Sequence, residues 1–470
     1  MRKTKIICTI GPASDSYEGI KNLMLAGMNV ARLNFSHDVH EKHLERINTI
    51  KKLRDELNLP VGIMLDTKGP EIRAGIFENG SVILGKGQTV TLTGKDVCGT
   101  EEVIPISYKN LDRHLNIGNI ILIDDGLIAL EVTDLKEDSV TCVVKNGGKL
   151  SSKKSINIPD VHIDMPYITE KDKADILFGA ENDIDFIAAS FVRNADDIRQ
   201  LKSLLPKRDH SRIKIIAKIE NREGVLNADE ILSECDGIMV ARGDLGVEVE
   251  YDMLPSIQKN LIKKCYAAGK IAITATQMLD SMIHNPRPTR AEVTDIANAI
   301  YDGTSAIMLS GETAAGSFPV ESVKTMATIA VSTEKNINYK KRFLVREVKN
   351  HTVTDAISHA ACTMAIDLNA SAIVAVTQSG YTAQMVAKFR PFCPIVAAAV
   401  HKKDFYQLSL TWGTYPILNE WLTSYKEIFE TAVEKSKHLD FVSPGDTLIV
   451  TGGSKAGVSG TTDTVRVYTI

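Results

Sequence analysis

The sequence predicts an α/β protein: a (β/α)8 TIM barrel, an all-β lid domain inserted into it, and a C-terminal α/β domain. Three observations support this fold class. Eight short apolar runs alternate with helical patterns, a glycine-punctuated stretch of alternating polarity interrupts them, and a new strand and helix pattern begins near the C-terminus. At 470 residues the chain exceeds one ordinary core, so several domains are expected.

The eight apolar runs predict parallel strands. They are apolar on both faces, as in a sheet covered by helices on both sides, and helical patterns such as residues 291–300 separate them. The runs are residues 6–10, 30–35, 61–65, 186–191, 213–219, 237–241, 271–275 and 305–309. Eight such units predict a closed barrel with its functional groups at the C-terminal strand ends. We assign residues 1–69 and 168–345 to it.

Residues 70–167, between the third and fourth predicted strands, predict the all-β insertion. Their alternating segments include residues 88–93, 120–123, 127–132 and 140–144. Because the insertion leaves from the C-terminal end of a strand, it should lie over the barrel mouth as a lid that excludes water. A decorative or oligomer-forming insertion is the alternative.

Residues 346–470 predict a separate α/β domain. A helix is expected at residues 353–368, and strands at 372–376, 395–400, 447–451 and 465–468. The turn at residues 377–382 would present N–H groups and hydroxyls at a helix N-terminus, an arrangement that suits phosphate. A simple connection between strand and helix is the alternative.

Polar and mostly charged groups follow seven of the eight predicted strands. Lys218 and Glu220 point to the same face of one strand, because side chains alternate, and the next strand is followed by Asp244. If these strands are parallel neighbours, the carboxylates converge and can hold a hard divalent cation beside the lysine. An internal ion pair is the alternative, but the other strand ends favour a site for phosphate chemistry.

Composition excludes several classes of protein. A formal net charge of -4 gives no basic field for non-specific nucleic-acid binding. Seven scattered cysteines, without a C-x-x-C pair, predict reduced thiols of a cytoplasmic protein. No apolar run has the length of a membrane span or of a signal-peptide core, so we expect no membrane association.

Six strings of the sequence resemble the pyruvate kinase family. They are ARLNFSH at 31–37, LDTKGPEIR at 65–73, AKIEN at 217–221, MVARGDLG at 239–246, the segment 274–290, and MLSGE at 308–312. The resemblance covers the whole chain, including the barrel, the inserted domain and the C-terminal domain. The length resembles short bacterial members without a further C-terminal extension. The resemblance implies phosphoryl transfer from phosphoenolpyruvate to ADP, giving pyruvate and ATP in the last step of glycolysis.

The resemblance implies roles for the barrel residues. Glu220 and Asp244 would bind Mg2+ or Mn2+, and Lys218 and Arg32 would stabilise the transferred phosphoryl group. Gly243 and Asp244 open a turn whose N–H groups would bind the substrate carboxylate. Thr276 resembles the residue linked to enolate protonation, where we expect it to position a water relay because a threonine hydroxyl is a poor acid.

Other residues resemble the cation, nucleotide and effector sites of the family. The K+ site would use Asn34, Ser36, Asp66 and Thr67. Glu71 stands where K+-dependent members of the family have a glutamate, so the resemblance implies K+ dependence. The nucleotide contacts would be Asn34, His37, Arg73 and Lys154. The effector phosphate site would use Thr377, Ser379, Gly380 and Thr382, although Tyr381 replaces a frequent basic residue, which leaves the effector open. A homotetramer is also implied.

Two other functions compete with this hypothesis. One is another Mg2+-dependent barrel enzyme that uses phosphoenolpyruvate or pyruvate, but such an enzyme needs neither a nucleotide lid nor a K+ site. The other is a catalytically inactive sugar-phosphate sensor. A sensor would be expected to have lost a charged site residue, yet Arg32, Lys218, Glu220 and Asp244 are all present.

Overall fold

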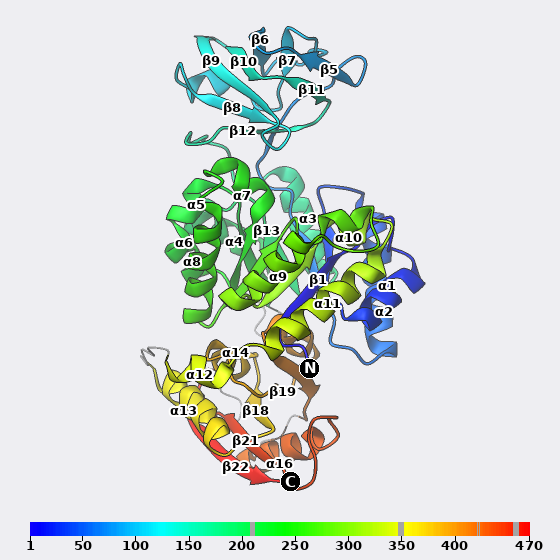
Figure 1. The fold of residues 1–470 in the computed structure, drawn as a ribbon, viewed down its shortest axis with the longest axis vertical. Helices are drawn as coiled ribbons and strands as arrows, with labels where there is room; N and C mark the ends of the chain where they lie inside the picture. The colour runs from blue at the N-terminus through cyan, green and yellow to red at the C-terminus, as the bar shows by residue number, and fades with distance from the viewer. Residues whose placement is uncertain (207–211, 346–351, 421, 423, 455–459) are drawn as a thin grey trace.

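A closed barrel of eight parallel strands occupies the centre of the computed structural model (Figure 1). The structure describes residues 1–470 except 207–211, 346–351, 421, 423 and 455–459. The barrel strands are β1 (Lys5–Thr9), β2 (Val30–Asn34), β3 (Gly62–Asp66), β13 (Phe186–Ala189), β14 (Lys214–Ile219), β15 (Gly237–Ala241), β16 (Ile271–Ala275) and β17 (Ala306–Leu309). All eight predicted strands are confirmed.

Nearly every residue of the eight strands is buried, as expected for a barrel filled inside by side chains and covered outside by helices. Inward side chains such as Ile7, Val30, Met64, Phe186 and Ile216 form a core inside the barrel. Outward side chains pack against the surrounding helices in a second, larger core. These helices are α1 (Tyr17–Ala26), α2 (His40–Glu56), α3 (Glu170–Glu181), α4 (Ala195–Leu204), α5 (Arg222–Leu226), α6 (Ala228–Glu234), α7 (Arg242–Glu248), α8 (Leu254–Ala267), α9 (Arg290–Asp302), α10 (Gly311–Ala314) and α11 (Pro319–Lys335).

Local sequence fixes the starts of two of these helices. Thr169 and Asp172 form a capping box at α3, and Thr289 and Glu292 form another at α9. In each box the two side chains accept hydrogen bonds from N–H groups that have no partner within the helix. The predicted helix at residues 291–300 is therefore confirmed as α9, with defined ends at both sides.

The insertion after β3 is a β domain above the barrel (Figure 1). Its strands are β4 (Ile72–Arg73), β5 (Ser81–Leu84), β6 (Thr89–Thr93), β7 (Val103–Pro105), β8 (Ile120–Ile123), β9 (Ile128–Lys136), β10 (Ser139–Asn146), β11 (Gly148–Ser151) and β12 (Ser155–Asn157). Seven form one sheet, and β11 pairs with β5. The domain has its own apolar core, including Phe77, Val90 and Ile121. We call it the lid.

The C-terminal region forms a five-stranded sheet in the order β20-β19-β18-β21-β22, below the barrel in Figure 1. Its strands are β18 (Ala372–Thr377), β19 (Ile395–Ala399), β20 (Thr414–Leu418), β21 (Thr447–Gly452) and β22 (Thr464–Thr469), and its helices are α12 (Tyr339–Leu344), α13 (Val353–Asp367), α14 (Tyr381–Lys388), α15 (Lys402–Gln407) and α16 (Tyr425–Ser436). The predicted α/β class is confirmed. The boundary predicted at residue 346 lies outside the described residues.

Ion pairs and hydrogen bonds join the base of the barrel to the C-terminal region. The Lys5 ammonium, at the start of β1, donates to the Thr414 carbonyl at 2.6 Å. Lys3 Nζ likewise donates to the Phe392 carbonyl at 2.7 Å.

All seven cysteines are free thiols, and only Cys98 among them is exposed. Within the described part of the chain, no helix has the length and apolarity needed to cross a membrane.

Candidate active site

A buried carboxylate, Asp66 at the end of β3, joins two cations from neighbouring parts of the barrel. Arg32 Nε on β2 donates to Asp66 Oδ2 at 2.6 Å, and Lys218 Nζ on β14 donates to Oδ1 at 3.0 Å. Burial raises the pKa of Asp66, but Arg32 and Lys218 oppose it, and the pKa lies below its ordinary value. Asp66 is therefore an ionised anchor that fixes both cations at the barrel mouth.

Lys218 lies within a dense network of oxygen atoms. Its ammonium donates to Ser190 Oγ at 2.7 Å and lies 3.0 Å from Glu220 Oε1. Burial lowers the pKa of Lys218, whereas Asp66 and Glu220 raise it, and the net result lies above the ordinary value. This lysine is therefore a fixed positive charge rather than a proton donor or base near neutral pH.

Glu220 and Asp244 converge at the C-terminal ends of β14 and β15, as the alternation of side chains predicts. Burial raises the pKa of Glu220 to about 7; Lys218 opposes this, while Asp244 and Asp66 add to it. Burial also raises the pKa of Asp244, while the charge of Lys218 and, to a lesser extent, a hydrogen bond with Glu220 oppose that change. Two crowded carboxyl groups of this kind repel each other when both are ionised, and a cation between them would relieve the repulsion.

These two carboxylates fit a magnesium ion in donor type and number. Mg2+ is commonly held by one or two protein carboxylates, with water and substrate oxygens completing its coordination. Among the residues that the structure describes, no group of three or more His, Cys, Asp and Glu side chains could hold a metal. A complete site would therefore need oxygens from bound substrate as well as from Glu220 and Asp244.

The loop after β16 carries Thr276 in a strained conformation. Thr276 has φ 67° and the next residue, Gln277, has φ 53°, in a region that side chains such as threonine rarely adopt. The Thr276 hydroxyl donates to the Ala275 carbonyl at 2.6 Å and accepts from the Gly243 N–H at 2.8 Å. The hydroxyl therefore ties the start of α7 to the end of β16.

Arg242 holds this strained loop in place. Its guanidinium donates to the Thr276 carbonyl at 2.6 Å and to the Ala275 carbonyl at 3.2 Å, and it forms an ion pair with Asp295 at 2.7 Å. The sequence predictions gave Arg242 no role. Its position directly before Gly243 and Asp244 was the sequence signal for a role in the site. Its hydrogen bonds and its ion pair, however, reach the end of β16 and α9, which are distant in the sequence.

The predicted K+ ligands lie at adjacent strand ends. Asn34 on β2 pairs in register with Asp66 on β3, and the Asn34 side-chain oxygen accepts from the Ser36 N–H at 3.1 Å. The Thr67 hydroxyl accepts from the Ser190 N–H at 3.0 Å. Neutral oxygens beside a single carboxylate suit a large monovalent cation, so the donor set fits K+ in chemical type.

The predicted nucleotide contacts are divided between barrel and lid. Arg73 and Lys154 lie together at the base of the lid, where β4 pairs with β12. Arg73 NH2 donates to Glu71 Oε2 at 2.9 Å, and Lys154 pairs with Asp124 at 2.8 Å. His37 is exposed on the barrel after β2. The lid cations thus already have carboxylate partners that a polyphosphate would have to replace.

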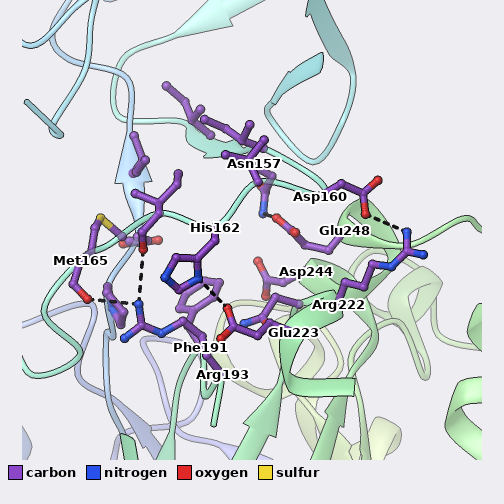
Figure 2. A pocket seen from close by; sticks show the side chains of 18 of the residues that line it. Asn157, Asp160, His162, Met165, Phe191, Arg193, Arg222, Glu223, Asp244 and Glu248 are labelled. Atoms are coloured by element: carbon purple, nitrogen blue, oxygen red, sulfur yellow. Dashed lines mark hydrogen bonds and ion pairs between the residues drawn. The ribbon is translucent and has the colours of Figure 1, made fainter. Parts of the chain in front are cut away.

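A cavity of about 400 Å³ separates the lid from the strand ends (Figure 2). Asp244, Phe191 and Glu71 line it, so the cavity reaches Asp244, one of the two converging carboxylates. At its rim, Asn157 of the lid donates to Glu248 at 2.9 Å, and Arg222 pairs with Asp160 at 2.7 Å (Figure 2). The lid lies over the mouth of the barrel, as its point of insertion predicts.

The predicted effector turn lies between β18 and α14. Gly380 has φ 78°, a conformation that favours glycine, and it begins α14. Thr377 and Thr382 are buried, and the Thr382 hydroxyl lies 2.9 Å from the hydroxyl of Thr462. Of the residues predicted to bind phosphate, Thr382 thus contacts a second loop at Thr462, and part of that loop lies outside the described residues.

Two further groups at the mouth were not assigned from the sequence. The Ser190 hydroxyl donates to the Thr67 carbonyl at 2.7 Å while it accepts from Lys218. The N–H of Phe191, which has φ 53°, donates to Glu220 Oε2 at 2.6 Å. Both residues belong to a predicted strand end, but only the positions of the neighbouring strands show which groups they orient.

Comparisons with known proteins extend along the whole chain. The family description "Pyruvate kinase, barrel domain" matches residues 1–323, and "Pyruvate kinase, alpha/beta domain" matches residues 355–468. The chain is 51% identical to a pyruvate kinase of Sporosarcina psychrophila, over 100% of this chain and 81% of the relative. It is 48% identical to one of Clostridium acetobutylicum, over 100% of both. A crystal structure of a Cryptosporidium parvum pyruvate kinase is similar, with TM-score 0.94 and 38% identity, over 100% of this chain and 96% of that one.

Proposed function

The chain belongs to the pyruvate kinase family and is a pyruvate kinase, and on this premise we propose how its residues carry out the reaction. The substrates are phosphoenolpyruvate and ADP, and the products are pyruvate and ATP. The observation that carries the proposal is the buried network in which Asp66 holds both Arg32 and Lys218 beside Glu220. If the purified protein forms no pyruvate from phosphoenolpyruvate and ADP in a coupled assay, the proposal is contradicted.

The reaction brings together two polyanions, so positive charge must be placed between them. Lys218 and Arg32 supply that charge from the protein and contact the phosphoryl group during transfer. Because Asp66 and Ser190 hold them in place, little reorganisation is needed as the transition state forms. A magnesium ion bound by Glu220 and Asp244 would neutralise charge on the enolate and phosphoryl oxygens.

The end of β16 and the start of α7 receive the organic part of the substrate. The N–H groups at the start of α7 bind the carboxylate of phosphoenolpyruvate, and a Cβ on Gly243 would meet the protein only at 3.7 Å. The protein itself thus has room for a side chain at Gly243. Glycine is needed there because a side chain would keep the substrate carboxylate away from the backbone N–H groups. Thr276 orients water for protonation of the enolate, because both hydrogen bonds of its hydroxyl fix its position.

The lid delivers the nucleotide contacts. Arg73 and Lys154 bind the ADP phosphates when the lid closes, and Asn34 and His37 contact the nucleotide from the barrel. Closure also removes water that would otherwise accept the phosphoryl group. The carboxylate partners of the two lid cations support this role, since Glu71 and Asp124 hold Arg73 and Lys154 in position at the base of the lid.

We further propose that K+ binds Asn34, Ser36, Asp66 and Thr67. Activity in potassium-free and sodium-free buffer with Mg2+ should fall on the order of 10²-fold, the cost expected when one preorganised electrostatic contact is lost. Glu71→Lys should restore K+-independent activity, because its ammonium can replace the cation. Glu71→Gln is the matched control and should not. Equal initial rates for the unmodified enzyme with and without K+ would exclude the cation site.

The affinity for the divalent cation should depend on pH. Glu220 has a pKa of about 7 in the metal-free protein, so its proton competes with the metal. Affinity should therefore rise about tenfold from pH 6 to pH 8, as expected for one competing proton with a pKa near the middle of that range. Mn2+ titration followed by electron paramagnetic resonance would measure it, with Glu220→Gln as the variant that loses the dependence.

The same pKa sets the direction of a stability change. The folded pKa of Glu220 lies above the ordinary value of 4.5, so its contribution to stability is fully present below about pH 4.5 and disappears as pH rises through about 7. Added Mg2+ should reverse this loss above pH 7. Identical Mn2+ affinities at pH 6 and pH 8 would contradict both parts of the prediction.

The C-terminal region supports a regulatory proposal. A phosphorylated metabolite would bind Thr377, Ser379, Gly380 and Thr382 and change the apparent affinity for phosphoenolpyruvate. The start of α14 supports phosphate binding there, since its cap residue, the left-handed Gly380, provides no side-chain hydrogen bond to the first N–H groups of the helix. We also propose a homotetramer, from family membership. The absence of any response to sugar phosphates or nucleoside monophosphates would remove the regulatory proposal.

A further inference from the structure

The loop after β2 carries two of the side chains proposed to bind K+. We call residues 34–38 the cation loop; it contains the proposed cation ligands Asn34 and Ser36 and the proposed nucleotide contact His37. The Asn34 side-chain oxygen accepts from the Ser36 N–H at 3.1 Å. Residues 36–38 are half-buried or exposed, so hydrogen bonds rather than apolar packing hold their backbone.

Two side chains from the surrounding helices bind carbonyl groups of the cation loop. On α2, His43 Nε2 lies 2.9 Å from the His37 carbonyl oxygen. On α3, Lys171 Nζ donates to the Phe35 carbonyl at 2.8 Å. The two carbonyls lie on either side of Ser36 in the sequence, so these bonds fix the backbone from which the Ser36 hydroxyl extends.

His43 is held in one orientation by its surroundings. It is only 1% exposed, and its ring stacks on that of Phe35, with centroids 3.9 Å apart and an angle of 9° between the planes. Stacking fixes the ring plane and therefore the direction of Nε2. Because a carbonyl oxygen can only accept, Nε2 carries the hydrogen in its bond to His37.

The ring of His43 is neutral near pH 7. Burial lowers the pKa of His43 below its ordinary value of 6.5, and Arg46 on the same helix adds to this, while the His37 carbonyl, Asp38 and Asp175 on α3 oppose it. Nδ1 is buried and has no hydrogen-bond partner among the described residues. The single N–H of the neutral ring is therefore used entirely on the cation loop.

Packing alone does not account for a histidine at position 43. Phenylalanine would fill the same space and stack on Phe35, and it would not bury an unpaired Nδ1. What phenylalanine lacks is the N–H group that the His37 carbonyl accepts. The histidine is thus explained by its bond to the loop.

We propose that His43 is a positioning residue for the monovalent cation: its Nε2–H holds the His37 carbonyl and so keeps Ser36 where its hydroxyl can bind K+. The inference rests on the proposed K+ site and adds to it a residue that acts through the loop. Without this bond, part of the binding energy of K+ is used to order the loop, so the affinity for K+ falls. Once K+ has bound, the site is the same as in the unmodified protein, so the maximal rate is retained.

The kinetics of two variants separate the hydrogen bond from the packing. His43→Phe retains the stacked ring without a donor, and His43→Gln retains an N–H donor of similar reach without the ring. The K+ concentration that gives half-maximal activity should rise about tenfold in His43→Phe, as for loss of one hydrogen bond. It should stay within about threefold of the unmodified value in His43→Gln, and kcat at saturating K+ should change less than about twofold in both variants.

Two further variants complete the comparison. His359→Phe is the same substitution in the C-terminal region, where His359 stacks on Phe343 with ring centroids 4.8 Å apart, and it should leave the K+ requirement unchanged. His43→Asn is polar like His43→Gln, but its amide is too short to reach the His37 carbonyl. It should therefore show the same rise as His43→Phe, even if His43→Phe does not fold.

Binding of Tl+ would test the site without turnover. Tl+ resembles K+ in charge and size, and it scatters X-rays anomalously. In crystals soaked at a subsaturating concentration of Tl+, an anomalous peak should lie beside Ser36 in the unmodified protein and in His43→Gln. The peak should be weaker in His43→Phe and in His43→Asn.

The outcomes separate this inference from the K+ site itself. If the unmodified enzyme neither requires K+ nor binds Tl+ beside Ser36, the cation site is wrong and the inference falls with it. If the unmodified enzyme does both, but His43→Phe and His43→Asn keep its K+ requirement and its Tl+ peak, only the inference is overturned. The inference is also overturned if His43→Gln loses as much K+ affinity as His43→Phe, or if kcat alone falls, since either result would mark a purely structural histidine.

Discussion

Replacing Lys218 with methionine should lower kcat by roughly three to five orders of magnitude, the range seen when a cation that contacts a transferred phosphoryl group is removed. Lys218 is buried, donates to Asp66 and Ser190, and carries a permanent charge at the barrel mouth. Methionine has similar length but neither charge nor donors. Steady-state kinetics of ADP-dependent pyruvate formation would measure the loss.

The same variant should retain its divalent metal site. Glu220 and Asp244 remain, and loss of Lys218 removes a neighbouring cation that competes with the metal for them. Mn2+ should therefore bind Lys218→Met at least as tightly as it binds the unmodified protein. A fall in kcat of less than about tenfold, which is ~1.4 kcal/mol in the barrier, would remove Lys218 from the transfer step.

Replacing Asp66 with asparagine should have the second-largest effect. Both Arg32 and Lys218 lose their shared carboxylate, so two buried cations remain with one neutral group between them. Breaking a buried ion pair by removing one partner typically costs about 3–5 kcal/mol of stability. Because the two cations also lose their fixed positions, kcat should fall on the order of 10²–10³-fold.

A matched control separates the two effects. Asp185 is equally buried, accepts from Arg54 at 3.1 Å and from the Ile63 N–H at 2.8 Å, and precedes β13 at the opposite end of the barrel. Asp185→Asn should lose comparable stability in urea unfolding but change kcat less than about twofold at a temperature where both variants are folded. If both variants lose activity equally, Asp66 acts only through stability.

The barrel was predictable because its strands are apolar on both faces, and this pattern depends on no distant contact. The sequence missed β20, which contains Pro416 and is only half-buried at the edge of its sheet. It also missed short lid strands such as β4, which has only two residues. Strands this short have no detectable alternation, so only their partners in the sheet define them.

The site could be predicted where its geometry follows from one strand. The alternation of side chains placed Lys218 and Glu220 on one face, and the parallel neighbours β14 and β15 bring Asp244 to the same end. The link from Asp66 to both cations could not be predicted, because β3 and β14 are separated by β13 and only the closed barrel brings them together. Arg242 was missed because its partners, at the end of the neighbouring strand β16 and on α9, are distant from it in the sequence.

The lid has an apolar core of its own that shares no residue with the barrel cores. Its side-chain contacts with the barrel include rim pairs such as Arg222 with Asp160 and His162 with Glu223, which are partly or largely exposed to water and contribute little. If the inserted domain closes as proposed, we therefore expect its open and closed positions to differ little in free energy. A bound nucleotide could then shift the equilibrium strongly toward closure with a few added contacts. Little of the nucleotide's binding energy would be spent on breaking contacts between lid and barrel.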